Sequence, residues 1–263
     1  MNVIQAIEAR KSVRTYTGAN LTEEQSSIIR KAIADATEPF GGQVSIKLTE
    51  IDLKAPYKPG TYGVISGATN YLLMGIADNR ESQLGAGFLM EQVVLKATGI
   101  GLGTCWIAAT FKNSDFEKLA NFGPDRPLRI VIPIGEPAEK QKFLEKATRL
   151  LVKSDKRKPF DELFFENDFQ HPLSAQNRFA QPLQMMRLAP SSTNSQPWRA
   201  VVEGNKVHFY YADKSKCSIL DCGIGLSHFV LTEHFNNQRG TFTHTNHPKS
   251  SQYHYLTTYT QEE

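Results

Sequence analysis

Cysteine is scarce in this sequence, and the few cysteines form no redox or metal motif. The 263 residues include three, Cys105, Cys217 and Cys222, with no Cys-x-x-Cys pair. An odd, unpaired set argues against a disulfide framework and is typical of proteins that keep their thiols reduced. Hydrophobic runs long enough to span a membrane are missing, and residues 1–5 lack the basic region and apolar core of a signal peptide. We therefore expect a cytoplasmic protein that does not bind a membrane.

Charge of one sign is also scarce. The formal net charge is +3, and the densest basic cluster, 153–158, is short and has no aromatic residues between its cations. Both features argue against nucleic-acid binding. His244, His247 and His254 lack the spacing and the acidic or cysteine companions of a metal site, so we expect no metal. No serine or cysteine nucleophile with a histidine partner is recognisable either.

One polar stretch is the strongest candidate for a ligand site: Ala189-Pro190-Ser191-Ser192-Thr193-Asn194-Ser195-Gln196-Pro197-Trp198. It holds no acid, base or cysteine, and its short hydroxyl and amide side chains lie between two prolines. Such residues hydrogen-bond to nearby backbone and keep the chain out of helix and sheet. The stretch is either a turn between a helix and a strand or a loop that holds a flat polar ligand.

A basic segment near the N-terminus is the second candidate. An expected helix over 2–10 runs directly into Arg10-Lys11-Ser12-Val13-Arg14. In an extended chain Arg10, Ser12 and Arg14 lie on one side. Two guanidinium groups flanking a hydroxyl suit a phosphate. A solvated basic turn is the alternative.

The remaining pattern predicts both helices and strands along the whole chain. Capping boxes predict helix starts at Asn2, Thr22 and Ser114. A helix over 85–98 is expected to end at Gly99, and a glycine-rich segment follows it. Because these glycines do not lie between a strand and a helix, they are not a dinucleotide-binding loop. They indicate either a close passage of backbone beside a flat group or simple strand–helix packing. Strands are expected at 44–48, 71–76, 129–135, 199–202, 207–211 and 252–259, with Pro133 at a sheet edge or an irregular end.

The second half of the chain repeats the order of the first. A helix that ends near Pro190 precedes two strands, as a helix that ends near Pro39 does earlier, and Gly223 begins a helix as Gly85 does. Only the first half has the Arg-x-Ser-x-Arg segment, and only the second has the polar loop. We therefore predict one compact domain made of two halves, 1–159 and 160–263, that share a single site.

Four segments together resemble the FMN-dependent nitroreductase family. They are 10–14, 101–107, 189–198 and, more weakly, Lys156-Arg157-Lys158-Pro159 with the Phe160-Asp161-Glu162-Leu163 that follows. The resemblance covers most of residues 1–200. In ordinary members the polar loop follows the Arg-x-Ser-x-Arg segment within one domain, and a homodimer shares two flavin sites. Here the loop comes in the second half, which is similar to the branch in which one chain carries both halves of the dimer.

The resemblance implies an α+β sandwich, with helices around a mixed, mainly antiparallel sheet and an internal duplication that mimics a dimer. It also implies one FMN per chain, with the chemistry at flavin N5 and no catalytic side chain. The implied FMN contacts are a phosphate and ring-edge group, a backbone passage beside N5, and a loop from the other half. The first group is Arg10, Lys11, Ser12, Arg14, Lys156 and Arg157, the second is Ile107, Ala108 and Ala109, and the third is Pro190, Ser191, Ser192 and Asn194.

The implied activity is flavin-mediated hydride transfer from NAD(P)H to a small flat acceptor such as a nitroaromatic or a quinone. The family often has an acidic residue or a glycine where this chain has Ala108 and Ala109, which leaves the preferred acceptor open. A monomer or a weak homodimer is expected. The alternative is a protein of the same fold that binds FMN without nicotinamide-driven turnover, which the unequal division of motifs between the halves favours.

Overall fold

The computed structural model describes residues 1–54, 59–139 and 156–262, so part of the expected basic cluster, 153–155, lies outside the described residues. Both halves contain helices and strands, as the sequence predicts. The first half contains α1 (Val3–Ala9), α2 (Glu23–Asp35), β1 (Val44–Glu50), β2 (Asn70–Ile76), α3 (Arg80–Gly99), β3 (Gly103–Thr104), α4 (Asn113–Ala120) and β4 (Leu128–Gly135). The second contains η1 (Phe160–Glu162), β5 (Phe164–Glu166), α6 (Ala180–Arg187), η2 (Ser192–Asn194), β6 (Trp198–Glu203), β7 (Lys206–Tyr211), α7 (Ser218–Phe235), β8 (Gly240–Thr243) and β9 (His254–Gln261).

Side-chain hydrogen bonds begin the first two helices where the sequence predicts them. At α1, Asn2 Oδ1 accepts the Gln5 N–H at 2.9 Å, and Gln5 Oε1 accepts the Asn2 N–H at 3.0 Å. Thr22 and Gln25 make the same reciprocal pair at α2. Each box satisfies two backbone donors that the first helical turn leaves without partners. The starts of these two helices are therefore determined by the local sequence.

The strands form two sheets with related topology. One is ordered β1-β2-β4-β3 and the other β5-β6-β7-β9-β8. All neighbouring strands are antiparallel except β5 and β6, which are parallel. Without β5, the second sheet has the order and strand directions of the first. Both sheets shift register at matching places, between Met74 and Gly75 in β2 and between Phe209 and Tyr210 in β7. The two halves are therefore structural repeats, as the internal echo in the sequence predicts.

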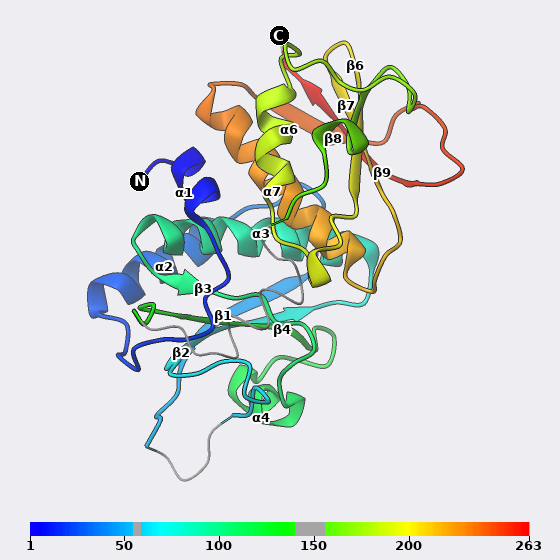
Figure 1. Ribbon diagram of the computed structural model, residues 1–263. Helices are drawn as coiled ribbons and strands as arrows, with labels where there is room; N and C mark the ends of the chain where they lie inside the picture. The colour runs from blue at the N-terminus through cyan, green and yellow to red at the C-terminus, as the bar shows by residue number, and fades with distance from the viewer. Residues whose placement is uncertain (55–58, 140–155, 263) are drawn as a thin grey trace.

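Helices α3 and α7 lie between the two sheets (Figure 1). α3 contacts β1 and β2, α7 contacts β6 and β7, and the two helices pack against each other. Within β2, Leu72 and Met74 belong to the core that α3 shares with α7, while Tyr71 and Leu73 pack with Phe116 of α4 on the other face. A strand buried on both faces gives an unbroken apolar run. Within the described ranges, no helix is both long and apolar enough to cross a membrane.

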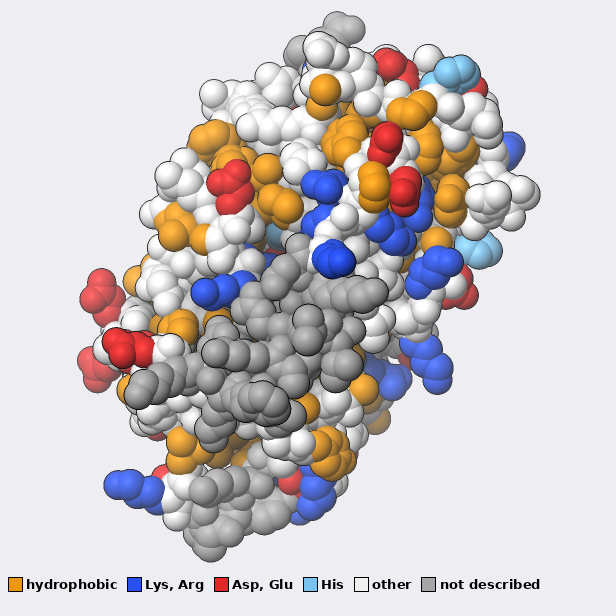
Figure 2. All heavy atoms as spheres, in the orientation of Figure 1, with side chains coloured by type: hydrophobic (Ala, Val, Ile, Leu, Met, Phe, Trp, Pro, Cys, Tyr) orange, Lys and Arg blue, Asp and Glu red, His pale blue; other side chains and the backbone are white. Residues whose placement is uncertain are grey.

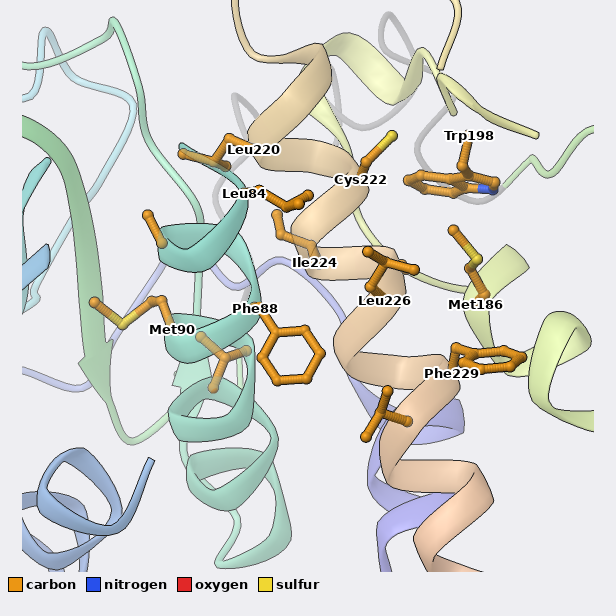
Figure 3. Packing of buried hydrophobic residues seen from close by; sticks show 14 of the residues in the cluster. Leu84, Phe88, Met90, Met186, Trp198, Leu220, Cys222, Ile224, Leu226 and Phe229 are labelled. Atoms are coloured by element: carbon orange, nitrogen blue, oxygen red, sulfur yellow. The ribbon is translucent and has the colours of Figure 1, made fainter. Parts of the chain in front are cut away.

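Two glycines let α3 and α7 pack closely. A Cβ on Gly87 would lie 2.0 Å from the Leu220 carbonyl oxygen, and a Cβ on Gly223 would lie 2.1 Å from the Leu84 carbonyl oxygen. The contact is reciprocal, as in an interface between two identical subunits: the same shift of 136 positions converts Leu84 into Leu220 and Gly87 into Gly223. Figure 3 shows Leu84 and Ile224 in the space between the two helices. The halves of this chain therefore meet as two subunits of a symmetric dimer would.

The helix starts predicted at Gly85 and Gly223 are wrong. Gly85 and Gly223 do not begin helices, because α3 already starts at Arg80 and α7 at Ser218. Both lie inside buried helical turns, where the lack of a side chain lets a neighbouring segment pack against the helix. The predicted end of α3 at Gly99 is confirmed, and the chain turns away just beyond it at the positive φ of Gly101 (84°).

Pro133 and Ser114 also differ from the predictions. Pro133 lies in β4, inside the sheet between β2 and β3. Proline is tolerated there because β3 pairs only with Ile134 and Gly135, which leaves Pro133 unopposed on that side. Ser114 is not a helix cap, because α4 begins one residue earlier at Asn113 and no side chain caps it.

Candidate functional site

A cavity of about 520 Å³ is lined by residues from both halves of the chain. Its walls come from the segment after α1, the segment after β3, the loop before β6 and the start of α7, which are far apart in the sequence. Every residue predicted for the site lines the cavity except Lys156. Those that do are Arg10, Lys11, Ser12, Arg14, Ile107, Ala108, Ala109, Arg157, Pro190, Ser191, Ser192 and Asn194. Lys156 is next to Arg157 in the chain, and its carbonyl oxygen accepts a hydrogen bond from Asn194 Nδ2 at 2.8 Å.

The Arg-x-Ser-x-Arg segment lies beside β3. Ser12 forms a parallel bridge with Thr104, and the Val13 N–H donates to the Thr104 carbonyl oxygen at 2.8 Å. Val13 is buried in the core next to β2, whereas Arg10, Ser12 and Arg14 line the cavity. The alternation that the sequence predicts therefore holds, and it brings two guanidinium groups and a hydroxyl to one wall.

The glycine-rich segment packs closely against another segment of the protein. A Cβ on Gly103 would lie 2.7 Å from a Val13 methyl carbon, so glycine is needed here for the basic segment to pack against β3. Gly101 serves a different purpose, because its positive φ lets the chain turn away after α3. Both glycines thus favour the packing interpretation over a close passage beside a flat ligand.

The wall that follows β3 contains Ile107, Ala108 and Ala109. The Ile107 N–H donates to the Val131 carbonyl oxygen at 3.1 Å, and the Val131 N–H donates back at 3.0 Å. The Ile107 amide is therefore used within the protein. Ala108 and Ala109 lie beyond this bridge and are exposed, which leaves these two as the candidate amide donors of the segment.

The polar loop 189–198 has an unusual backbone. Thr193, Asn194 and Gln196 have φ values of 50°, 57° and 49°, in the left-handed region that residues other than glycine seldom adopt. The Gln196 N–H donates to Ser191 Oγ at 2.9 Å, and Gln196 Nε2 donates to the Asn194 carbonyl oxygen at 3.1 Å. Strain that surrounding contacts maintain is common at ligand sites and is not required by a plain turn.

Arg157 ties the loop to the segment 156–158. Its Nη2 donates to the Leu188 carbonyl oxygen at 3.0 Å, and its Nη1 donates to Asn194 Oδ1 at 3.3 Å. The Lys158 N–H donates to the Gln196 side-chain oxygen at 2.8 Å. Asn194 therefore uses both ends of its amide, one toward Arg157 and the other toward the backbone of segment 156–158. The loop and this segment form one wall held by side-chain hydrogen bonds.

Arg14 brings an unsatisfied donor to the cavity. Its Nη1 is buried and has no hydrogen-bond partner among the described residues, and Arg14 lines the cavity. A buried cationic donor without an acceptor is unfavourable. An anionic or carbonyl-bearing ligand in the cavity would supply the missing acceptor.

Asp221 lines the cavity but is not among the residues predicted for the site. It lies in the first turn of α7, it is 2% exposed, and its Oδ2 accepts the Ser192 N–H at 3.0 Å. Burial raises the pKa of this carboxyl to about 7, and the hydrogen bond from Ser192 opposes that shift. Burial, with a smaller contribution from Asp221, also raises the pKa of the neighbouring Cys217 thiol. The charge of this wall therefore changes near neutral pH.

Lys158, next to the wall residue Arg157, lies near other cations: burial, followed by the nearby charges of Arg199 and Lys214, lowers its pKa. On the face drawn in Figure 2, several Lys and Arg side chains lie near one another. No group of three or more His, Cys, Asp or Glu side chains in the described ranges could hold a metal ion.

Two repeated halves that enclose one cavity, with an arginine-rich segment on one side and a polar loop on the other, define a single-chain α+β sandwich of the nitroreductase class. The family model described as "Putative TM nitroreductase" matches residues 2–233. The chain belongs to this nitroreductase family and is accordingly an oxidoreductase. None of the curated proteins matches it significantly.

One solved structure shows this fold over the whole chain, and shorter nitroreductases match about half of it. A crystal structure described as a "putative nitroreductase" from Thermotoga maritima is 21% identical, with a TM-score of 0.61, and the match covers 99% of this chain and 93% of that chain. A nitroreductase with bound FMN from Bacteroides fragilis is 16% identical, with a TM-score of 0.44, and the match covers 54% of this chain and 92% of that chain. An FMN-dependent nitroreductase from Clostridium difficile is 18% identical, with a TM-score of 0.43 and coverages of 53% and 90%.

Proposed function

We propose that this chain binds one FMN in the cavity and uses NAD(P)H to reduce small flat acceptors such as nitroaromatics or quinones. The observation that carries the proposal is the meeting of the three distant segments, 10–14, 107–109 and 190–194, in one cavity. When bound, FMN would supply hydride transfer at N5, which is why no nucleophile or general base of the protein is required.

The residues of the cavity suit this cofactor. Its volume of about 520 Å³ is within the range of roughly 300–1,000 Å³ that is common for cofactor sites. The walls include the apolar side chains of Val64, Leu188 and Ile224, against which a flat ring could pack, and several cations for a phosphate. The buried Arg14 Nη1 has no acceptor in the part of the chain that the structure describes, and flavin carbonyl oxygens or phosphate oxygens would provide one.

The cations would divide between the two ends of the cofactor. Arg10, Ser12 and Arg157 would hold the phosphate, where guanidinium forks bind strongly, with Lys11 and Lys156 nearby. Arg14 would present its charge to the polar edge of the ring and favour the build-up of negative charge there. The amides of Ala108 and Ala109 would face N5.

The polar loop would cover the ring from the other half. Pro190, Ser191 and Ser192 would contact it, while Asn194 would act mainly through its bonds to the segment 156–158. Because each half contributes only part of the site, we propose the halves 1–159 and 160–263 as its two structural components and a stoichiometry of one FMN per chain. A monomer or weak homodimer would then suffice for activity.

Reconstitution tests the proposal. Purified protein is incubated with FMN, freed of excess ligand by gel filtration and examined for flavin absorbance. NADH and NADPH oxidation are then followed with menadione as a quinone acceptor. We expect bound flavin and acceptor-dependent oxidation; the absence of both contradicts the proposal. Bound flavin that dithionite reduces but neither nicotinamide reduces would favour the alternative of FMN binding without turnover.

A further inference from the structure

A buried carboxylate lies directly behind the cavity wall. Glu91 of α3 is fully buried, and its Oε2 accepts the indole N–H of Trp106 at 2.9 Å. Its Oε1 lies 2.9 Å from His228 Nε2 and 3.9 Å from Arg10 Nε. Trp106 and Arg10 both line the cavity. Glu91 therefore contacts two residues of the wall without belonging to it.

The protons on His228 follow from its two partners. Its Nδ1 lies 3.0 Å from the Met185 carbonyl oxygen, which can only accept, so this nitrogen carries a hydrogen. Its Nε2 faces the Glu91 carboxyl, and one further proton lies between these two groups. Whichever of the two holds that proton, the pair is neutral in total. The positive charge of Arg10 is then not cancelled by the acid beside it.

The same pair connects both sides of the cavity. Glu91 bonds to the wall made by the first half, while His228 bonds to Met185 of α6, the helix that leads into the polar loop. Both side chains are fully buried at the crossing of α3 and α7. Removing only one member of such a buried pair is costly, because the other polar group is left buried without its partner.

This network departs from the symmetry of the two halves. The shift of 136 positions that relates Gly87 to Gly223 relates Glu91 to Ser227 and His228 to Gln92. The acid is thus supplied only by the first half and the imidazole only by the second. Two identical subunits would each carry the carboxyl and the imidazole, whereas this chain has one of each, both on the side of the molecule on which Arg10 lies.

We infer that Glu91 and His228 are positioning residues for the cavity: Glu91 orients Arg10 and Trp106, and His228 balances the charge of Glu91, so that Glu91 does not neutralise Arg10 toward an anionic ligand. The inference rests on the proposed function in using FMN as the ligand. Neither residue touches the reacting atoms.

A double-mutant cycle tests the positioning. FMN affinity is measured by quenching of flavin fluorescence in the wild-type protein, Arg10→Ala, Glu91→Gln and the double variant. Arg10→Ala is expected to weaken FMN binding about 10- to 100-fold in the wild-type background, and about threefold or less when Glu91→Gln is already present. Equal losses in both backgrounds overturn the inference. Glu233→Gln, a buried acid of α7 outside the cavity wall, is the matched control and should leave the full loss in place.

Riboflavin, which lacks the phosphate, tests the charge balance. His228→Gln is expected to weaken FMN binding about tenfold while changing riboflavin affinity less than about twofold. An equal loss for both ligands indicates a general disturbance of the cavity and contradicts the role of His228. Circular dichroism verifies folding. If His228→Gln does not fold, the double-mutant cycle with the isosteric Glu91→Gln still tests the inference. A wild-type protein that binds no FMN overturns the proposed function and this inference together, whereas FMN binding without coupling overturns the inference alone.

Discussion

Arg14 lines the cavity with a buried donor, Nη1, that has no acceptor among the described residues. We expect Arg14→Ala to weaken FMN binding by about 1.5–3 kcal/mol, the range for hydrogen bonds to charged groups. Because Nη1 makes no hydrogen bond to the described part of the protein, the melting temperature of the ligand-free protein should change little.

Isothermal titration and thermal denaturation measure the two effects separately. Arg129→Ala, an exposed arginine of β4 outside the cavity wall, is the matched control and should change neither. An Arg14→Ala variant that binds FMN normally would show that this guanidinium does not contact the cofactor.

Asp221 and Glu233 make stability depend on pH near neutrality. Burial raises the pKa of each carboxyl to about 7. The folded protein holds these protons between about pH 4 and pH 7, where the unfolded chain has lost them, so stability falls as pH rises from about 4 through about 7 and then levels off. Asp221→Asn or Glu233→Gln should each reduce that fall, as urea denaturation at pH 5, 7 and 8.5 would measure.

Ligand affinity separates these two acids. Above pH 7 the ionised Asp221 adds negative charge to the cavity and should weaken binding of the anionic FMN. Asp221→Asn should remove this dependence, and Glu233→Gln, which lies outside the wall, should retain it. Titrations at pH 6.5 and 8.5 compare the variants; identical pH dependence in wild type and Asp221→Asn would rule out a role for this carboxyl in ligand binding.

At the scale of helices and strands, the sequence predicts what local chemistry determines. The capping boxes at Asn2 and Thr22, the alternation at 10–14 and the apolar run of β2 depend on neighbouring residues, and the structure has them as expected. The capping box predicted at Ser114 is wrong, because the same spacing of serine and glutamate can also occur inside a helix.

The helix glycines could not be interpreted from the sequence alone. A glycine in a helical pattern suggests that the helix ends there, unless another segment fills the space where a side chain would be. Only the fold shows that α7 fills this space at Gly87. The same limit applies to Glu91, His228 and Asp221. They are single polar residues in buried helices, and their partners come from distant parts of the chain.

The α3–α7 contact can be tested by adding one methyl group. The Cβ of Gly223→Ala would lie 2.1 Å from a backbone oxygen, so we expect a destabilisation of about 1–3 kcal/mol from overpacking. Gly99→Ala, at the open end of α3 with no atom within 4 Å of its Cβ, should instead stabilise by about 0.5 kcal/mol. Urea denaturation measures both, and a Gly223→Ala variant as stable as Gly99→Ala would contradict the close packing.

For the whole molecule, the division of the site between unlike halves predicts a stoichiometry. Arg10 and Arg14 come from the first half only, and the loop at 190–194 from the second only. We therefore expect one FMN per chain at saturation, measured as flavin absorbance relative to protein concentration after gel filtration. A ratio of two would mean that the pseudo-symmetric side also binds flavin.

Both walls of the cavity are covalently parts of one chain, and the α3–α7 crossing holds them together. A site shared by two separate subunits disappears on dilution, since the fraction of assembled pairs depends on concentration. Here the second wall is always present at a fixed effective concentration. Activity should therefore rise in direct proportion to the number of copies, even when a cell contains only a few of them.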